Sequence, residues 1–262
     1  MIKTLYDRRD IFLSRPEWRS TPWKSIEKAP YDAIVDVIYD VFAVLQKFDE
    51  TCSKEDPLKR RDGLYEIITT CLDLENQLKR VYDKFDNSVP GPLYWPQLSK
   101  LESNLDDDIS GKVFPISFYF STFFVAQVVL GYWSAMTTVH HQLMCTYQKL
   151  AEIELPSTHG GSNDAARAID VRFSIHLAAD RADEHARLSE DMARNLCQSV
   201  EYSLQDRMGG LGPLAVLTHL SGCLDYLLNR QERFQREAKW MRETMGRIKH
   251  KVVLPQKNRF QC

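Results

Sequence analysis

The longest stretch without a charged side chain restricts the fold of this chain more than any other feature. Val113 to Gln148 is 36 residues long and contains no Asp, Glu, Lys or Arg. A segment of this kind is buried either in a protein core or in a membrane. A membrane-spanning helix needs about 20 predominantly apolar residues, whereas Ser, Thr and Gln leave Val128 to Trp133 as the longest stretch free of them. We therefore predict a long buried central helix and keep a membrane-associated protein, held by residues 114–139, as an alternative.

Apolar residues recur at three- and four-residue steps along most of the chain, which is typical of helices that bury one face. Alternating strand-like runs are nearly absent, and glycine and proline are scarce, with 11 of each. The first two helices are expected over residues 31–48 and 56–85, where Asp56 is placed to cap the second helix and Pro57 suits its first turn. The sequence therefore predicts an all-α, multi-helix globular domain.

Three segments are expected along the chain. Residues 1–30 contain three prolines that disfavour helix, so an irregular segment packed on the body is predicted there. Residues 31–228 are predicted to form the helical domain, in which 156–163 (PSTHGGSN) is the candidate linker. Residues 229–262 are predicted to form a basic amphipathic helix and tail.

The last of these segments is basic, whereas the rest of the chain is acidic. Residues 229–262 hold ten Lys or Arg and three acidic residues, which gives +7, and the remaining 228 residues carry −9. Such a bias is found in nuclear import signals and in phosphate-contacting segments, and a solvated helix face has the same composition. The candidate import or phosphate-contact patch consists of Arg247, Lys249, Lys251, Lys257 and Arg259.

Apolar residues also follow a heptad-like 4-3 spacing from Leu220 to Val252. This stripe packs either against the core of the same chain or against a second copy in a coiled coil. We expect the first arrangement, and the homodimer is the alternative.

Leader and cysteine patterns point to an intracellular protein, nuclear or cytoplasmic. The first thirteen residues contain no apolar run of the length that a secretory signal needs. The six cysteines lie at least 19 residues apart, so the C-x-x-C spacing of zinc knuckles and dithiol motifs does not occur. We expect reduced cysteines, no metal and no cofactor.

The chain carries no recognisable catalytic signature. Nucleophile-elbow and glycine-rich phosphate-binding motifs are missing. His140 and His141 are adjacent and point about 100° apart on a helix, so they do not share one metal ion. His176 and His185 stand among acidic residues that suit an exposed, salt-bridged helix. We therefore expect no catalytic residue.

An all-α enzyme acting on a hydrophobic, isoprenoid-like substrate is the alternative. Its candidate magnesium ligands are Asp106, Asp107 and Asp108, but carboxylates that do not recur at i and i+4 cannot bind a metal from one helix face. Its candidate pocket would be lined by Phe118, Phe120, Phe123, Phe124, Tyr132 and Trp133. Aromatic residues at helical spacing more often belong to a core.

Ala193 to Leu228 resembles a block near the C-terminus of many fungal zinc binuclear-cluster transcription regulators. In that block a helix ends in a Tyr-containing turn, which Met, Gly and Gly-Pro follow before an apolar helix. Further blocks match in the expected order, namely Phe12-Leu13-Ser14, Trp18, Pro22-Trp23, Leu93-Tyr94-Trp95, Phe114 to Phe118 and Tyr132-Trp133. The resemblance implies an all-α regulatory region with no catalytic residues.

One departure from the family pattern concerns DNA binding. The DNA-binding module of these regulators packs six cysteines within about 30 residues so that their thiolates bridge two zinc ions, and the cysteines here are spread from Cys52 to Cys262. The resemblance therefore implies a regulatory region without its DNA-binding cluster, with no sequence-specific DNA binding by this chain alone. It would act through partners in the transcription machinery, a DNA-binding relative or a small effector, in a setting such as fungal secondary-metabolite gene regulation.

Overall fold

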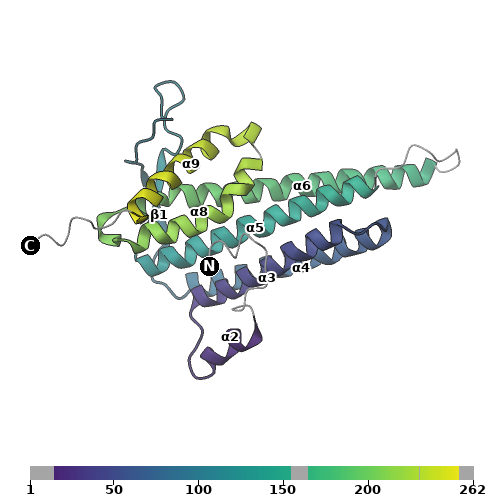
Figure 1. The fold of residues 1–262 in the computed structure, drawn as a ribbon, viewed down its shortest axis with the longest axis horizontal. Helices are drawn as coiled ribbons and strands as arrows, with labels where there is room; N and C mark the ends of the chain where they lie inside the picture. Colours follow the sequence, from purple (N-terminus) through teal and green to yellow (C-terminus); the bar gives the residue numbers. More distant parts are fainter. Residues whose placement is uncertain (1–14, 155–164, 230, 254–262) are drawn as a thin grey trace, which may run out of the picture. The chain divides into compact units, whose positions relative to one another are not determined.

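A computed structural model describes residues 15–154, 165–229 and 231–253, and helices dominate them (Figure 1). The predicted all-α class is confirmed. The elements are α2 (Pro16–Ser20), η2 (Thr21–Trp23), α3 (Pro30–Cys52), α4 (Pro57–Asp86), β1 (Tyr94–Leu98), β2 (Ile116–Phe120), α5 (Phe123–Glu154), α6 (Ala165–Gln198), α7 (Val200–Ser203), η3 (Asp206–Met208), α8 (Leu211–Asn229) and α9 (Gln231–Val253). Among the described residues, no helix combines the length and the hydropathy that crossing a membrane requires.

The chain divides into two compact units. Unit 1 consists of residues 1–80 and 135–189, and unit 2 of residues 81–134 and 190–262. The boundaries between them fall inside α4, α5 and α6. The three segments expected from composition stay predictions, and the candidate linker at 156–163 lies outside the described residues.

In unit 1, α3 and α4 form where apolar residues were found at helical spacing. α3 buries Ile34, Val37, Val41 and Val44, which follow each other at three- and four-residue steps. The Asp56 carboxylate accepts hydrogen bonds from the amides of Leu58 (2.9 Å) and Lys59 (3.4 Å), so the predicted N-cap is confirmed. Gly63 of α4 lies against Thr51 of α3, and a Cβ there would come within 2.7 Å of the Thr51 methyl group. The two helices therefore pack closely at this end of the pair.

The segment before α3 contains a short helix that was not predicted. α2 begins at Pro16, because proline is tolerated in the first turn of a helix. Its Arg19 guanidinium donates to both carboxylate oxygens of Asp40, at 2.6 and 2.8 Å, and Lys28 pairs with Asp36. These ion pairs join the segment to α3, and the Trp18 side chain is 53% exposed.

In unit 2, the uncharged segment does not begin as a helix. Ile116–Phe120 forms β2, which pairs with the antiparallel strand β1, so the first residues of the uncharged segment 113–148 are not part of the predicted long helix. On one face of β2, Phe118 and Phe120 lie near the Trp133 ring, and on the other face the hydroxyls of Ser117 and Tyr119 donate to Glu201. This alternation extends over only five residues, which is a weak strand signal within a long uncharged segment. The helix α5 begins at Phe123 and is buried along most of its length, which confirms the long buried helix.

The register of the two strands explains why β1 tolerates a proline. The Ser99 amide donates to the Pro115 carbonyl at 2.9 Å, and hydrogen-bonded pairs in an antiparallel ladder alternate with non-hydrogen-bonded ones. Pro96 opposite Phe118 is therefore a non-hydrogen-bonded pair, and the nitrogen of Pro96 points to the outer edge of β1. Tyr94 and Phe118 on the same face contact the Trp133 ring of α5, with centroids 5.0 and 5.8 Å away.

α8 and α9 complete unit 2 and pack against each other. Gly212 in the first turn of α8 allows a close approach, since a Cβ there would lie 2.2 Å from the Ser203 carbonyl oxygen. The described part of the heptad-like stripe is buried inside the unit, as expected for packing against the same chain. Its buried described members are Leu220, Phe234, Ala238, Met241, Met245 and Ile248.

Candidate interaction surface

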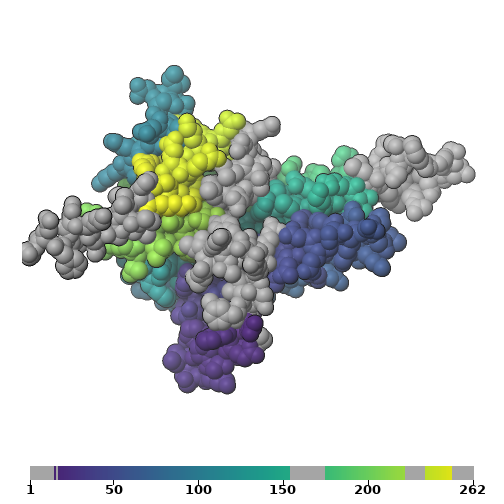
Figure 2. Space-filling model, viewed as in Figure 1, coloured from purple at the N-terminus to yellow at the C-terminus, as the bar shows by residue number. Residues whose placement is uncertain are grey.

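α9 has two faces of different chemistry. One face is apolar and packed in unit 2, and the other lies at the surface, where Figure 2 shows the helix in yellow. The two acidic residues of its described part, Glu237 and Glu243, are half-buried. The exposed side chains are Gln235, Lys239, Arg242, Arg247 and Lys249. From Lys239 onward, every exposed side chain in the described part of α9 is therefore cationic.

Three of these cations lie on one line. Lys239, Arg242 and Lys249 fall within an arc of about 80°, because successive residues of a helix turn by about 100°. Lys249 follows Lys239 by ten residues, which is about 15 Å along the helix. We call these three residues the basic stripe. A helix that is fixed by its apolar face presents such a stripe in one orientation.

The five residues of the predicted patch do not share one environment in the structure. Lys249 is exposed in the basic stripe. Arg247 donates to the Glu102 carbonyl at 3.2 Å and to the Thr244 hydroxyl at 3.4 Å, so its guanidinium turns toward the chain. Lys251 belongs to α9, but its side chain is outside the described part, as are Lys257 and Arg259 altogether.

Sequence reasoning missed two members of the basic stripe. Lys239 and Arg242 lie upstream of the predicted patch, which was drawn around the last cations of the chain. The signal that could have found them is the helical spacing of Lys239, Arg242 and Lys249 once the buried positions of α9 are assigned. Arg236, a further cation of α9, is not available to a partner because it binds a loop of unit 2.

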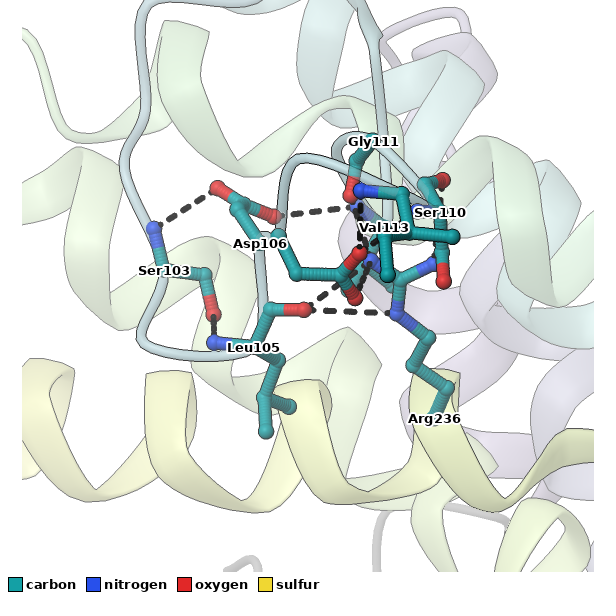
Figure 3. A network of polar contacts seen from close by, with 9 residues as sticks. Ser103, Leu105, Asp106, Ser110, Gly111, Val113 and Arg236 are labelled. Atoms are coloured by element: carbon teal, nitrogen blue, oxygen red, sulfur yellow. Dashed lines mark hydrogen bonds and ion pairs between the residues drawn. The ribbon is translucent and has the colours of Figure 1, made fainter.

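Figure 3 shows Arg236 of α9 against the segment 103–113, which we call the acidic loop. Its guanidinium donates to the Leu105 carbonyl at 2.9 and 3.3 Å and to the Ser110 carbonyl at 3.2 Å, and it also bonds the Gly111 carbonyl. An ion pair with Asp107, at 3.5 Å, adds to these contacts. α9 therefore fixes the backbone of the acidic loop.

Two of the three candidate magnesium ligands of the alternative enzyme, Asp106 and Asp107, accept hydrogen bonds from backbone amides. The Asp106 carboxylate accepts from the amides of Ser103 (2.9 Å) and Val113 (3.0 Å). Asp107 accepts from the amides of Ile109 (2.9 Å) and Ser110 (2.5 Å), and the hydrogen bond from Ser110 is the main cause that lowers the pKa of Asp107. In the described part of the chain, no three His, Cys, Asp or Glu side chains are arranged to hold a metal ion.

Glu201 of α7 binds the chain on both sides of the acidic loop. Its carboxylate accepts hydrogen bonds from the hydroxyls of Ser99, Ser117 and Tyr119, each at 2.8 Å, and from the amides of Lys100 (2.9 Å) and Leu101 (3.2 Å). Burial raises the pKa of Glu201, but these hydrogen bonds outweigh it, so the pKa is lowered. The donors lie 82 to 102 residues from Glu201 in sequence, and no sequence signal indicates the contact.

The aromatic residues of the predicted hydrophobic pocket are distributed over separate contacts. Phe118, Phe120 and Trp133 lie in one cluster, with ring centroids 5.8 and 6.2 Å apart. Tyr132 instead stacks on Tyr82 at 4.2 Å, and Phe124 meets the Phe85 ring edge-on at 5.9 Å. Phe120, Tyr132 and Trp133 are buried in unit 2, whereas Phe124 is 47% exposed.

His185 contacts His140 in unit 1, an arrangement that sequence reasoning also missed. The two Nδ1 atoms are 3.1 Å apart, and the Tyr147 ring stacks on His185 at 5.7 Å. Both imidazoles are buried. Burial lowers the pKa of His140 to about 4 and also lowers the pKa of His185. Both rings are neutral near pH 7, so one Nδ1–H can donate to the other Nδ1.

No family model matches the chain, and comparisons with curated proteins and with solved structures give no significant match. The resemblance to fungal zinc binuclear-cluster regulators therefore stays a prediction from the residues that carry it.

Proposed function

We propose that this chain is a non-enzymatic, transcription-regulator-like protein that contacts an acidic protein partner through the basic stripe. The observation that carries the proposal is the surface of α9, where every described exposed side chain from Lys239 onward is cationic. The partner would belong to the transcription machinery or be a DNA-binding relative. The resemblance to fungal regulators is the support for this setting, including secondary-metabolite gene regulation.

The apolar face of α9 supports this use of the helix. Phe234, Met241 and Ile248 are no more than 1% exposed, because they pack inside unit 2. The helix therefore presents charge rather than apolar surface to a partner. Complementary charge contributes to association rate and specificity more than to raw affinity, which suits a regulatory contact that is made and broken.

A protein partner agrees better with the number of cations than DNA does. Each phosphate contact contributes a slope of about −0.9 to the dependence of log K on log salt, and a protein with 6–10 such contacts loses about 10³–10⁵ in affinity between 50 and 200 mM salt. The three described side chains of the basic stripe, over about 15 Å, would by themselves give weak, salt-sensitive DNA binding. We expect equal and weak affinity for any two duplexes of the same length, measured by fluorescence anisotropy at 50 and 200 mM salt.

A tethered reporter assay tests the proposed function. The full chain is fused to a heterologous DNA-binding domain, and expression of a reporter gene with the matching operator is measured. The chain should change reporter expression, and reversing the basic stripe (Lys239→Glu, Arg242→Glu, Lys249→Glu) should abolish the change. The matched control reverses three exposed cations of α4, Lys59, Arg61 and Arg80, and should keep it.

Two results would overturn the proposal. The first is a chain that leaves reporter expression unchanged at normal protein level. The second is a stripe variant that remains as active as the α4 control. In vitro, the stripe variant should bind a fluorescent 20-residue glutamate-rich peptide about tenfold more weakly than the control at 50 mM salt, since an exposed ion pair contributes about 0.2–1 kcal/mol.

A further inference from the structure

Ile109 in the acidic loop is 99% exposed, more than any other large apolar side chain described. A single exposed apolar residue on a protein surface is ordinary and needs no explanation. The backbone that carries Ile109 is not ordinary, because it is fixed both from within the loop and from another element.

The turn under Ile109 is closed by its own hydrogen bonds. The Asp107 and Gly111 backbones bridge each other, at 2.9 Å from the Gly111 amide and at 3.4 Å from the Asp107 amide. The Asp107 carboxylate also accepts the amides of Ile109 and Ser110. Gly111 has φ +68°, a conformation that side chains disfavour, so glycine suits the closing position.

Arg236 then holds the turn from α9. It donates to three carbonyls of the acidic loop, those of Leu105, Ser110 and Gly111 (Figure 3). Asp106 closes the base of the loop by joining Ser103 to Val113. The backbone of the loop is therefore already ordered in the folded protein. Binding of a partner to the tip does not lose affinity to ordering this backbone.

The charges beside Ile109 distinguish between classes of partner. Two carboxylates directly precede the isoleucine: that of Asp107, which is half-exposed and paired with Arg236, and that of Asp108, which is exposed and whose charge faces solvent. They oppose approach to an anionic membrane or to a nucleic acid. They complement a protein surface on which Lys or Arg side chains border an apolar pocket. Anchors in protein interfaces have this arrangement, with an apolar side chain in a pocket and a polar rim.

We propose that the turn 107–111 is a preformed protein-binding loop that inserts Ile109 into an apolar pocket bordered by basic side chains on a partner protein. This surface is separate from the basic stripe and carries the opposite charge. The proposal therefore goes beyond the proposed function, and the failure of one leaves the other standing.

Site-specific photo-crosslinking followed by titration tests this proposal. p-Benzoylphenylalanine replaces Ile109 in the full chain, and crosslinked proteins from an extract of the cells that express the chain are identified. Capture alone does not count as support. The captured protein is purified and titrated with the wild-type chain, with Ile109→Ala and with Asp108→Lys. We expect Ile109→Ala to weaken binding at least tenfold and Asp108→Lys at least threefold.

Two further variants separate anchoring from general surface effects. Leu211 of α8 is also an exposed apolar residue, at 67%, and Leu211→Ala should change the affinity less than twofold. Arg236→Ala removes the clamp but leaves Ile109 in place, and it should weaken binding severalfold because the loop must then be ordered on binding. Thermal melting of Ile109→Ala should match that of the wild type, since its side chain is fully exposed.

Three results would overturn the proposal. The first is an Ile109→Ala variant that binds the captured protein as tightly as the wild type. The second is crosslinking from position 109 to lipid, nucleic acid or a second copy of this chain rather than to another protein. The third is the absence of any crosslinked protein.

Discussion

His140 and His185 are the ionisable residues whose burial has the clearest consequence for stability. The charged and titratable groups that act on the pair come from three helices: Glu75 and Lys79 of α4, Tyr147 of α5, and Arg181 and Glu184 of α6. Burial is the largest effect, and it favours the neutral form of both rings. Protonation of the pair would place positive charge in the core of unit 1, where it is poorly solvated.

Acid should therefore destabilise unit 1. The pKa of His140 in the folded chain is about 4, below about 6.5 in the unfolded chain, so the unfolded state takes up the proton first. Stability is complete above about pH 6.5 and falls as the pH approaches 4. At pH 5 the loss from His140 alone is on the order of 2 kcal/mol. Urea unfolding at pH 7.5 and pH 5.0 measures it.

Two variants assign this pH dependence to the buried pair. His140→Gln should lose less stability than the wild type between pH 7.5 and 5.0, because one titrating group is removed. His176→Gln is the control, since His176 is exposed on α6, and it should follow the wild type. An equal pH dependence in all three proteins would show that the pair does not cause it.

At the scale of elements, the helices follow from apolar spacing and the strands do not. α3 and α4 were predictable because Ile34, Val37 and Leu64, Ile67 repeat at helical steps on one buried face. β2 was not, because its alternation of apolar and polar residues covers only Ile116 to Phe120 and lies inside a 36-residue segment without charged residues. Contacts such as that of Arg236 with Leu105 join residues that are 131 positions apart. The sequence around either residue does not indicate such a contact.

Glu201 provides a test of how the strands are held in unit 2. Glu201→Ala removes the acceptor for five donors, and we expect a loss of about 2 kcal/mol in the free energy of unfolding, together with faster amide hydrogen exchange at Lys100 and Leu101. Asp191→Ala is the control, because its side chain is 65% exposed and surface ion pairs contribute little. Unchanged exchange at both amides would contradict the anchoring role.

At the scale of the whole molecule, composition and packing divide the chain at different places. Charge marks a boundary near residue 229, where the chain becomes basic. Packing does not follow it, because α9 supplies Phe234, Trp240 and Met241 to the core of unit 2, each at most 3% exposed. The basic character belongs to the exposed side of a helix whose other side belongs to the core.

Removing residues 230–262 should therefore unfold unit 2. Full burial of one large apolar side chain contributes about 1.5–3 kcal/mol, and the loss of several exceeds the stability of about 5–15 kcal/mol that is usual for a domain. Near-ultraviolet circular dichroism and thermal melting should show the loss of a cooperative transition. The control replaces Lys239, Arg242 and Lys249 by Ala in the full chain, which should melt like the wild type. A truncated chain that melts normally would contradict this prediction.

The proline in β1 has a further consequence for the behaviour of the protein at high concentration. The outer edge of a short antiparallel ribbon is a template on which strands of other molecules can add, and this is a common route to aggregation. Pro96 interrupts the row of amide hydrogens on that edge of β1, so an incoming strand would meet a position with no donor. The β1 edge of the ribbon is thereby protected against strand addition, although the exposed Leu98 side chain would otherwise favour it.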